Sequence, residues 1–147
     1  MTDVSAFAEL SALDHGLCTL NTLRNDGSIQ SSVVNAGVMA HPRTGQPIVA
    51  LVAIGAARKL RNLRADPRVT TVARAGWQWV TVEGTAEIIG PDDPDIDAES
   101  LRLLLRTVFV AAGGTHDDWD TYDRVMREER RAAVLISPTR VYTNPAR

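Results

Sequence analysis

The amino-acid sequence predicts a mainly β, α+β fold in which an antiparallel sheet curls into a barrel with helices at its rim. The expected elements follow the order β-β-β-α-β-β-α-α-β after a short N-terminal helix. Turn signals typical of hairpins join the strands, and one long strand alternates apolar with polar residues. With 147 residues, 44% hydrophobic and 23% charged, the chain is expected to form a single soluble domain over residues 1–147.

The first half of the chain is expected to form a helix and three strands. Apolar residues at helical spacing predict a short helix over 3–13. Strands are expected over 17–23 and 29–39, joined by an Asp-Gly pair at 26–27 that is typical of a hairpin. Residues 48–54 are apolar on both faces, which predicts a central strand of the sheet.

The next two strands are expected over 69–73 and 77–89, after Pro67 has ended the preceding segment. In the longer strand, apolar residues alternate with Thr and Glu, so one face is expected to be buried and the other polar. Gly84 lies inside this strand, where it predicts a bulge or a close approach of another backbone.

The last elements are expected to be helices over 96–111 and 117–130 and a strand over 132–142. Three aspartates before the first of these helices have the spacing of a calcium loop, but Ala98 replaces the required glycine and Leu104 the required glutamate. We therefore expect no metal site here, and interpret the acidic residues as complementing the helix dipole.

The stretch AARKLRNLRADPR, residues 56–68, is the most distinctive part of the chain. Leu60 and Leu63 would share the buried face of a helix, while cationic side chains cover the rest. Five basic residues against one acidic residue give residues 54–68 a charge of +4, so the rest of this −2 chain carries −6. A bound anion at the start of the helix would explain the segment, and an ordinary solvated helix face remains the alternative. The small residues at 55–57 would let a ligand approach closely.

Several kinds of catalytic chemistry lack candidates in this sequence. His15, His41 and His116 have no partner at a metal-ligand spacing, and Cys18 has no second cysteine. No serine has a GxSxG setting, and the GxGxxG and GxxxxGK[ST] motifs are absent. If the protein is an enzyme, an organic cofactor must supply the difficult step, and no catalytic side chain is assigned.

Two tryptophans lie close together at the start of the long strand. Trp77 and Trp79 are expected either to cap the barrel core or a dimer interface, or to place one indole against a planar ring whose phosphate is bound at Arg58 and Lys59.

These residues together resemble a known family. Residues 55–59, GAARK, followed by Leu63, the DPRV run at 66–69 and Trp77, are similar to the phosphate-binding segment of the pyridoxamine-phosphate-oxidase-like split β-barrel flavoproteins. The segments ARKLRNLRADPR, GWQWVTVEGTAEI, GTHDDWDTYDRVM and RVY resemble the actinobacterial deazaflavin branch, whose members are reductases that use coenzyme F-420. The resemblance extends from about residue 10 to residue 142.

The resemblance implies a homodimeric split barrel with two cofactor sites at the dimer interface. By this likeness, the cofactor phosphate or acidic tail is held by cationic and amide side chains, its ring is lined by β-strand residues, and a tryptophan reaches across from the partner subunit. The corresponding residues are Arg58, Lys59 and Asn62 for the anion, Asn35, Val52, Ala53 and Ile54 for the ring, and Trp77 for the cross-subunit contact.

The sequence also departs from the flavin oxidases of this superfamily. Ala57 precedes the Arg-Lys pair where those enzymes commonly have Ser, and their C-terminal Trp and Arg pattern is not evident after Arg131. Oxidation of pyridoxamine phosphate is therefore not expected, and FMN is the alternative to the deazaflavin. The negative charges of the F-420 tail suit a site rich in arginine and lysine.

The predicted function is that of an oxidoreductase in which reduced coenzyme F-420 transfers hydride to an unsaturated small molecule, such as a quinone, enone or tetrapyrrole. The alternatives are an FMN-binding oxidoreductase and a non-catalytic deazaflavin carrier. Nucleic-acid binding is disfavoured because the remaining chain is acidic. A single cysteine, no secretion-signal pattern and no apolar run of membrane-spanning length predict a cytoplasmic protein without a membrane span.

Overall fold

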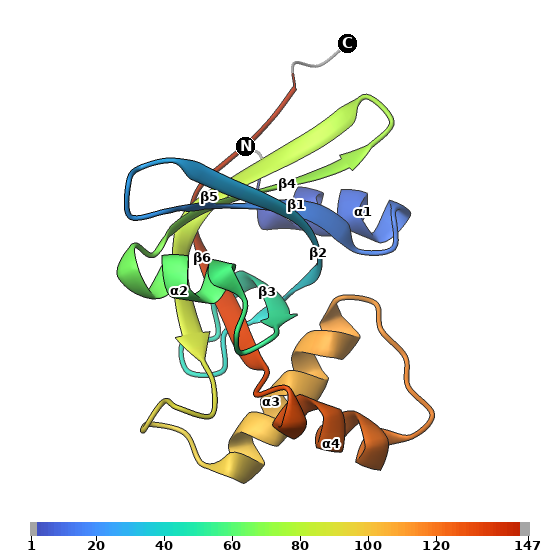
Figure 1. Ribbon diagram of the computed structural model, residues 1–147. Coiled ribbons are helices and arrows are strands. Elements are labelled where there is room, and N and C mark those ends of the chain that lie inside the picture. The colour runs from blue at the N-terminus through green and yellow to red at the C-terminus, as the bar shows by residue number, and fades with distance from the viewer. Residues whose placement is uncertain (1–2, 145–147) are drawn as a thin grey trace.

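The computed structural model describes residues 3–144. Within them, six strands form a closed antiparallel barrel in the order β1-β2-β3-β6-β5-β4, accompanied by four helices (Figure 1). The strands are β1 (Leu17–Leu23), β2 (Ile29–Ala40), β3 (Pro47–Ala53), β4 (Arg68–Ala75), β5 (Gln78–Ile89) and β6 (Ala132–Thr143). The helices are α1 (Val4–Leu13), α2 (Arg58–Ala65), α3 (Ala98–Ala111) and α4 (Trp119–Glu128). The predicted fold class is confirmed.

Short turns determine how the strands pair. In the β1–β2 hairpin Leu23 pairs with Ile29, Gly27 has a φ of 84°, and the Ser28 N–H donates to Asp26 Oδ1 at 2.9 Å. The predicted Asp-Gly hairpin is thus confirmed. In the β4–β5 hairpin Ala75 pairs with Gln78, so the two residues between them reverse the chain. The prediction that strand β5 starts at Trp77 was therefore wrong.

The bulge predicted at Gly84 is present. The register of β5 with β6 shifts between Glu83 and Gly84. A Cβ atom at position 84 would lie 2.5 Å from the Ser137 carbonyl oxygen, so the two backbones approach too closely for any side chain there. Both readings of this glycine, a bulge and a close backbone contact, are confirmed.

Two apolar cores lie on opposite sides of β3 and β6. The barrel interior contains Val49, Leu51 and Val134, and α1 and α2 add Phe7 and Leu60 to it. The second core lies between the outer face of β3 and β6 and helix α3, and it contains Ile48, Ala50, Leu104, Leu105, Val108 and Leu135. Because β3 is buried on both faces, its prediction as a central strand is confirmed.

Helix α2 is shorter than the basic stretch that predicted it. Ala57 is its N-cap, with extended backbone and no side-chain cap, and Asp66 ends it before Pro67. Leu60 and Leu63 are buried as expected. Strand β3 ends at Ala53, one residue earlier than predicted.

Candidate functional site

A pocket of about 510 Å³ lies between the barrel and the α3–α4 pair. Its barrel side comes from β2, β3 and the start of α2, and comprises Val33, Val34, Asn35, Val52, Ala53, Ile54, Ala57 and Lys59. Its helical side comprises Val108, Phe109, Ala112, Tyr122, Met126 and Arg131. The lining is mostly apolar with a cation on each side, which suits a flat organic molecule that carries negative charge or polar oxygens.

Five of the eight residues predicted to bind a cofactor line this pocket, namely Asn35, Val52, Ala53, Ile54 and Lys59. They come from β2, β3 and the first turn of α2, which are separated along the chain. The structure brings them together because β2 pairs with β3 through Ala36 and Leu51, and β3 leads directly into α2.

Asn35 connects both sides of the pocket. Its amide nitrogen donates to the His15 carbonyl at 2.7 Å and to the Ala112 carbonyl at 3.2 Å. Both amide hydrogens are thereby used to hold the α1–β1 turn and the end of α3. The amide oxygen accepts no hydrogen bond within residues 3–144, so it is available to a donor on a ligand.

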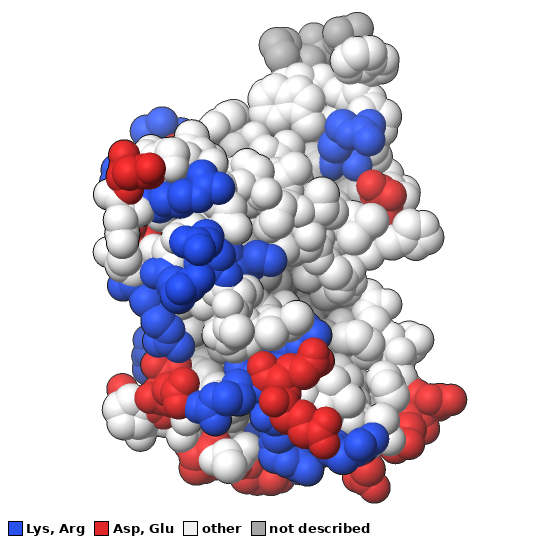
Figure 2. Space-filling view, in the orientation of Figure 1, with Lys and Arg blue, Asp and Glu red and all other residues white. Residues whose placement is uncertain are grey.

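The start of α2 carries cations without acidic partners. Within residues 3–144, no carboxylate lies within 4.0 Å of Arg58, Lys59 or Arg61. Arg64, by contrast, is 3.3 Å from Asp93. Lys and Arg side chains gather over α2 on the face shown in Figure 2. The first N–H groups of α2 have no side-chain cap, so backbone and side chains together favour an anion beside the pocket.

The family follows from comparison with known proteins. The sequence matches the pyridoxamine 5'-phosphate oxidase family over residues 6–144. The chain belongs to this family. The predicted membership of the wider pyridoxamine-phosphate-oxidase-like, oxidoreductase-type group is therefore confirmed.

Several solved structures share the fold of this pyridoxamine 5'-phosphate oxidase family member. A conserved hypothetical protein from Mycobacterium tuberculosis is 23% identical with a TM-score of 0.67, and the match covers 97% of this chain and 84% of that one. An F-420 reductase is 18% identical with a TM-score of 0.59, over 86% of this chain and 88% of that one. A pyridoxamine 5'-phosphate oxidase-related, FMN binding protein from Nostoc punctiforme PCC 73102 is 11% identical with a TM-score of 0.64, over 97% and 84%.

The pocket of this pyridoxamine 5'-phosphate oxidase relative fits a phosphate-bearing flavin-type cofactor. The unpaired cations and uncapped N–H groups of α2 provide charge and donors for a phosphate, and the apolar strands β2 and β3 provide a surface for a ring. Within the described residues, no three His, Cys, Asp or Glu side chains come together as a metal site would require. None of the helices there is long and apolar enough to cross a membrane.

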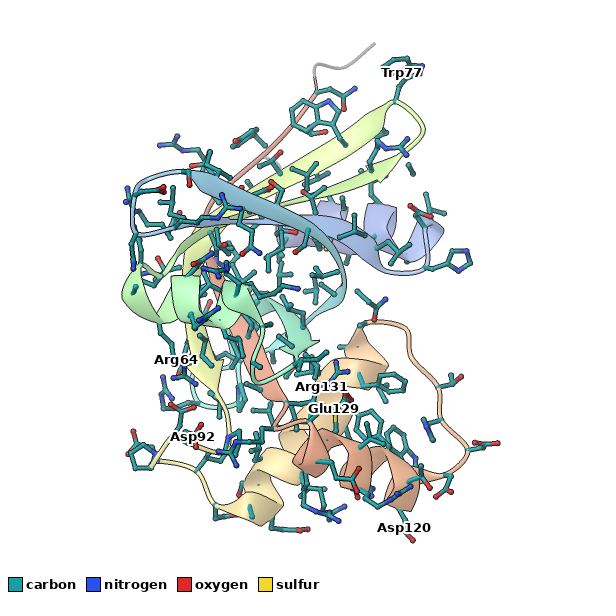
Figure 3. All side chains as sticks on the ribbon, in the orientation of Figure 1. Arg64, Trp77, Asp92, Asp120, Glu129 and Arg131 are labelled. Carbon is teal, nitrogen blue, oxygen red and sulfur yellow. The ribbon has the colours of Figure 1, made fainter. Side chains whose placement is uncertain are left out.

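The other three predicted residues do not line the pocket. Asn62 is buried, and its amide nitrogen donates to Thr22 Oγ1 at 3.1 Å and Gln30 Oε1 at 2.9 Å, so it holds α2 against the barrel. Trp77 is 89% exposed at the tip of the β4–β5 hairpin, which Figure 3 shows projecting away from the part of the protomer that contains Arg131. Arg58 is exposed at the first position of α2, beside the pocket residue Ala57.

Gly55 lies where two connections of the chain pack against each other. Its N–H donates to the Glu129 carbonyl at 3.1 Å, and a Cβ atom would lie 2.4 Å from the Arg130 carbonyl oxygen. The small residue therefore lets the β3–α2 connection pack against the α4–β6 connection. Close approach of a ligand at Gly55 stays a prediction.

The sequence patterns did not predict the residues on the helical side of the pocket. Tyr122 lines it, but burial raises the pKa of its hydroxyl to about 12, an effect that the charge of Arg131 opposes. This hydroxyl donates to the Leu105 carbonyl at 2.9 Å, so it is committed to packing. Phe109 lies beside it, with ring centroids 5.0 Å apart. The apolar spacing of the two helices predicted buried faces and carried no signal for a pocket.

Arg131 is the second cation of the pocket. It is the last residue of the connection between α4 and β6, where Figure 3 shows it next to Glu129. Its Nη2 donates to the two carboxylate oxygens of Glu129 at 3.1 and 3.2 Å. Its Nε is buried and has no hydrogen-bond partner within the described residues. A buried donor without an acceptor is uncommon in folded proteins and calls for an explanation.

Proposed function

We propose that this protein is a homodimeric oxidoreductase that uses reduced coenzyme F-420 to transfer hydride to an unsaturated small molecule of the quinone, enone or tetrapyrrole class. The observation that carries the proposal is the apolar pocket whose barrel side ends at the unpaired cations of α2. Family membership supports flavin-type chemistry, and the F-420 reductase of the same fold supports the deazaflavin.

The bound cofactor supplies the hydride, and the protein's residues bind and orient it. Lys59 and Arg58 hold the phosphate or acidic tail by charge-assisted hydrogen bonds. Val52 and Ala53 pack against the ring, and the free amide oxygen of Asn35 accepts from a ring N–H. The Tyr122 hydroxyl has a raised pKa and already donates to the Leu105 carbonyl, so it is not assigned as the proton donor, and the substrate takes its proton from solvent or from another nearby side chain.

The exposed apolar residues of the pocket favour a second copy of the chain as its cover. Val33 and Ile54 line the pocket and are 68% and 45% exposed in the protomer. The projecting Trp77 is suited to reach the pocket of the partner in such a dimer. In a W77A variant, sedimentation equilibrium is expected to show a weaker dimer, and titration a weaker cofactor affinity. Unchanged values for both would remove Trp77 from the site.

Titration of the purified protein with coenzyme F-420 and, separately, with FMN tests the cofactor assignment. The deazaflavin is expected to bind with micromolar or tighter affinity, and FMN more weakly because Ala57 offers no hydroxyl to a phosphate. Replacing Lys59 by Met is expected to weaken binding by about tenfold or more, since hydrogen bonds to charged groups are worth about 1.5–3 kcal/mol. Arg127→Met, which removes an exposed cation of α4, is the matched control. Micromolar FMN binding without deazaflavin binding would refute the proposal.

The FMN-binding alternative is favoured by the FMN binding protein from Nostoc punctiforme, which has the same fold. The titration above decides between the two cofactors. A non-catalytic carrier is separated by turnover assays with quinones, enones and tetrapyrroles, because a carrier would bind reduced F-420 yet oxidise it no faster than buffer.

A further inference from the structure

Arg131 occupies the pocket without using all of its donors. Glu129 engages only Nη2, the buried Nε has no acceptor, and Nη1 makes no hydrogen bond within residues 3–144. We infer that Arg131 is a ligand-binding residue, positioned by Glu129, whose guanidinium donates to a carbonyl or carboxylate oxygen of the molecule in the pocket. This inference rests on the proposed function, because it takes the same pocket as the ligand site.

Backbone hydrogen bonds fix the main chain at Arg131, and the Glu129 carboxylate fixes the guanidinium. The Arg131 N–H donates to the Met126 carbonyl at 2.9 Å, and the Gly55 N–H fastens the Glu129 carbonyl to the β3–α2 connection at 3.1 Å. Arg131 therefore belongs to a fixed α4–β6 connection, which is fastened to the connection that leads into the helix carrying Lys59. A guanidinium held this way is preorganised for a ligand, since little side-chain freedom is lost on binding.

A purely structural ion pair between Arg131 and Glu129 explains the arrangement less well. The Arg131 and Glu129 side chains are 25% and 36% exposed, and ion pairs at such exposure contribute little to stability. An ion pair that leaves Nε buried and unsatisfied would contribute even less to stability, because desolvation of Nε costs free energy. An acceptor supplied by a ligand accounts for the unused donors and for the position of the side chain in the pocket wall.

The surroundings of Arg131 specify the ligand further. Tyr122, Met126 and Val108 make this side of the pocket apolar, and a hydrogen bond from a cation is stronger in such an environment than in water. The ligand group opposite Arg131 is thus an oxygen acceptor on a mainly apolar body. A ring carbonyl of the cofactor and a carbonyl or carboxylate of the substrate share this chemistry, and the experiment below separates them.

The test compares wild-type protein with Arg131→Met, Arg131→Lys and Glu129→Gln, with Arg127→Met as the control for loss of one positive charge. Dissociation constants are measured for oxidised coenzyme F-420 and for FMN. Menadione, a quinone, is then titrated into protein saturated with oxidised cofactor, where no reduction occurs. The melting temperature of each unliganded variant is also recorded, because removing an unsatisfied donor in R131M is expected to leave it unchanged or raised.

Arg131→Met is expected to weaken one ligand by about ten- to one-hundredfold, the range for a hydrogen bond from a charged donor, while R127M binds like wild type. Weakened cofactor binding assigns the acceptor to the cofactor ring, and weakened menadione binding alone assigns it to the substrate. R131K, which keeps the charge, is expected to recover part of the affinity, and E129Q to lose a smaller part. If the wild type binds cofactor, and R131M and R131K bind both the cofactor and menadione as tightly as the wild type does, the inference is overturned and the proposed function stands. If the wild type binds neither cofactor, both the inference about Arg131 and the proposed function are refuted.

Discussion

Replacing Asp123 by Asn is expected to loosen the helix pair that forms the outer side of the pocket. Asp123 is a buried residue of α4 that accepts three hydrogen bonds from α3. Arg106 Nε lies 2.9 Å from Oδ1, Arg106 Nη2 lies 2.5 Å from Oδ2, and Arg102 Nη1 lies 3.1 Å from Oδ2. These bonds join α3 to α4 across the polar edge of their contact.

The size of the effect follows from what Asn retains. Asn can still accept from Arg106 Nε, but the bonds to Oδ2 and the negative charge are lost. The two arginine side chains are 30% and 25% exposed, so water replaces part of the lost interaction. With charged hydrogen bonds worth about 1.5–3 kcal/mol each, we expect D123N to lower the free energy of unfolding by about 2–3 kcal/mol. For a domain of this size, that corresponds to a melting temperature lower by about 6–9 °C.

The difference in the free energy of unfolding between D123N and wild type is expected to depend on pH. The hydrogen bond from Arg106 is the main cause that holds the pKa of Asp123 below its ordinary value, and the bond from Arg102 adds to it. A carboxylate with a lowered folded-state pKa stabilises the protein above its unfolded pKa, near 3.9, and this contribution is lost as pH falls through the folded value. D123N and wild type should therefore differ by a constant amount from pH 7 to about 5 and converge below about 4.

Urea denaturation followed by circular dichroism at pH 7, 5 and 3.5 measures these differences. Asp120→Asn, at an exposed position in the first turn of α4 (Figure 3), is the control and should change stability by a few tenths of a kcal/mol at most. A D123N variant within about 0.5 kcal/mol of wild type at pH 7 would refute the reasoning, because surface substitutions alone reach that size.

Three further outcomes are expected. Gly37→Ala should cost about 3 kcal/mol in urea denaturation, because its Cβ would lie 2.0 Å from the Ala111 carbonyl oxygen of α3; a stable variant would show that α3 can shift away from β2. Tyr122→Phe should cost about 1 kcal/mol through loss of the hydrogen bond to the Leu105 carbonyl, which keeps its helical partner, and an unchanged melting curve would mean that this bond does not stabilise the protein. Burial raises the pKa of the Cys18 thiol, so native protein should react with iodoacetamide far more slowly than protein in urea, and equal rates would contradict its burial.

The barrel strands could be predicted from sequence because their signals are local. The Asp-Gly pair at 26–27 favours a chain reversal through its own backbone preferences, and a glycine inside a strand, as at position 84, indicates a bulge or a close backbone contact. The basic face of α2 is likewise readable from the spacing of Leu60 and Leu63. Charge and position alone predicted an anion at Arg58 and Lys59, whereas the residues predicted to line a cofactor ring came only from the family resemblance, and their role stays a prediction.

Only the tertiary structure decided which residues share the pocket. Phe109, Tyr122 and Arg131 meet Val52 and Lys59 across fifty or more residues of chain because α3 packs on the outer face of β3 and α4 packs against α3. No local pattern could show that Arg131 keeps a donor without an acceptor, since this depends on the position of Glu129 and on the packing around it. The sequence by itself determined the elements and the charge of α2, whereas long-range packing determined the second wall of the pocket.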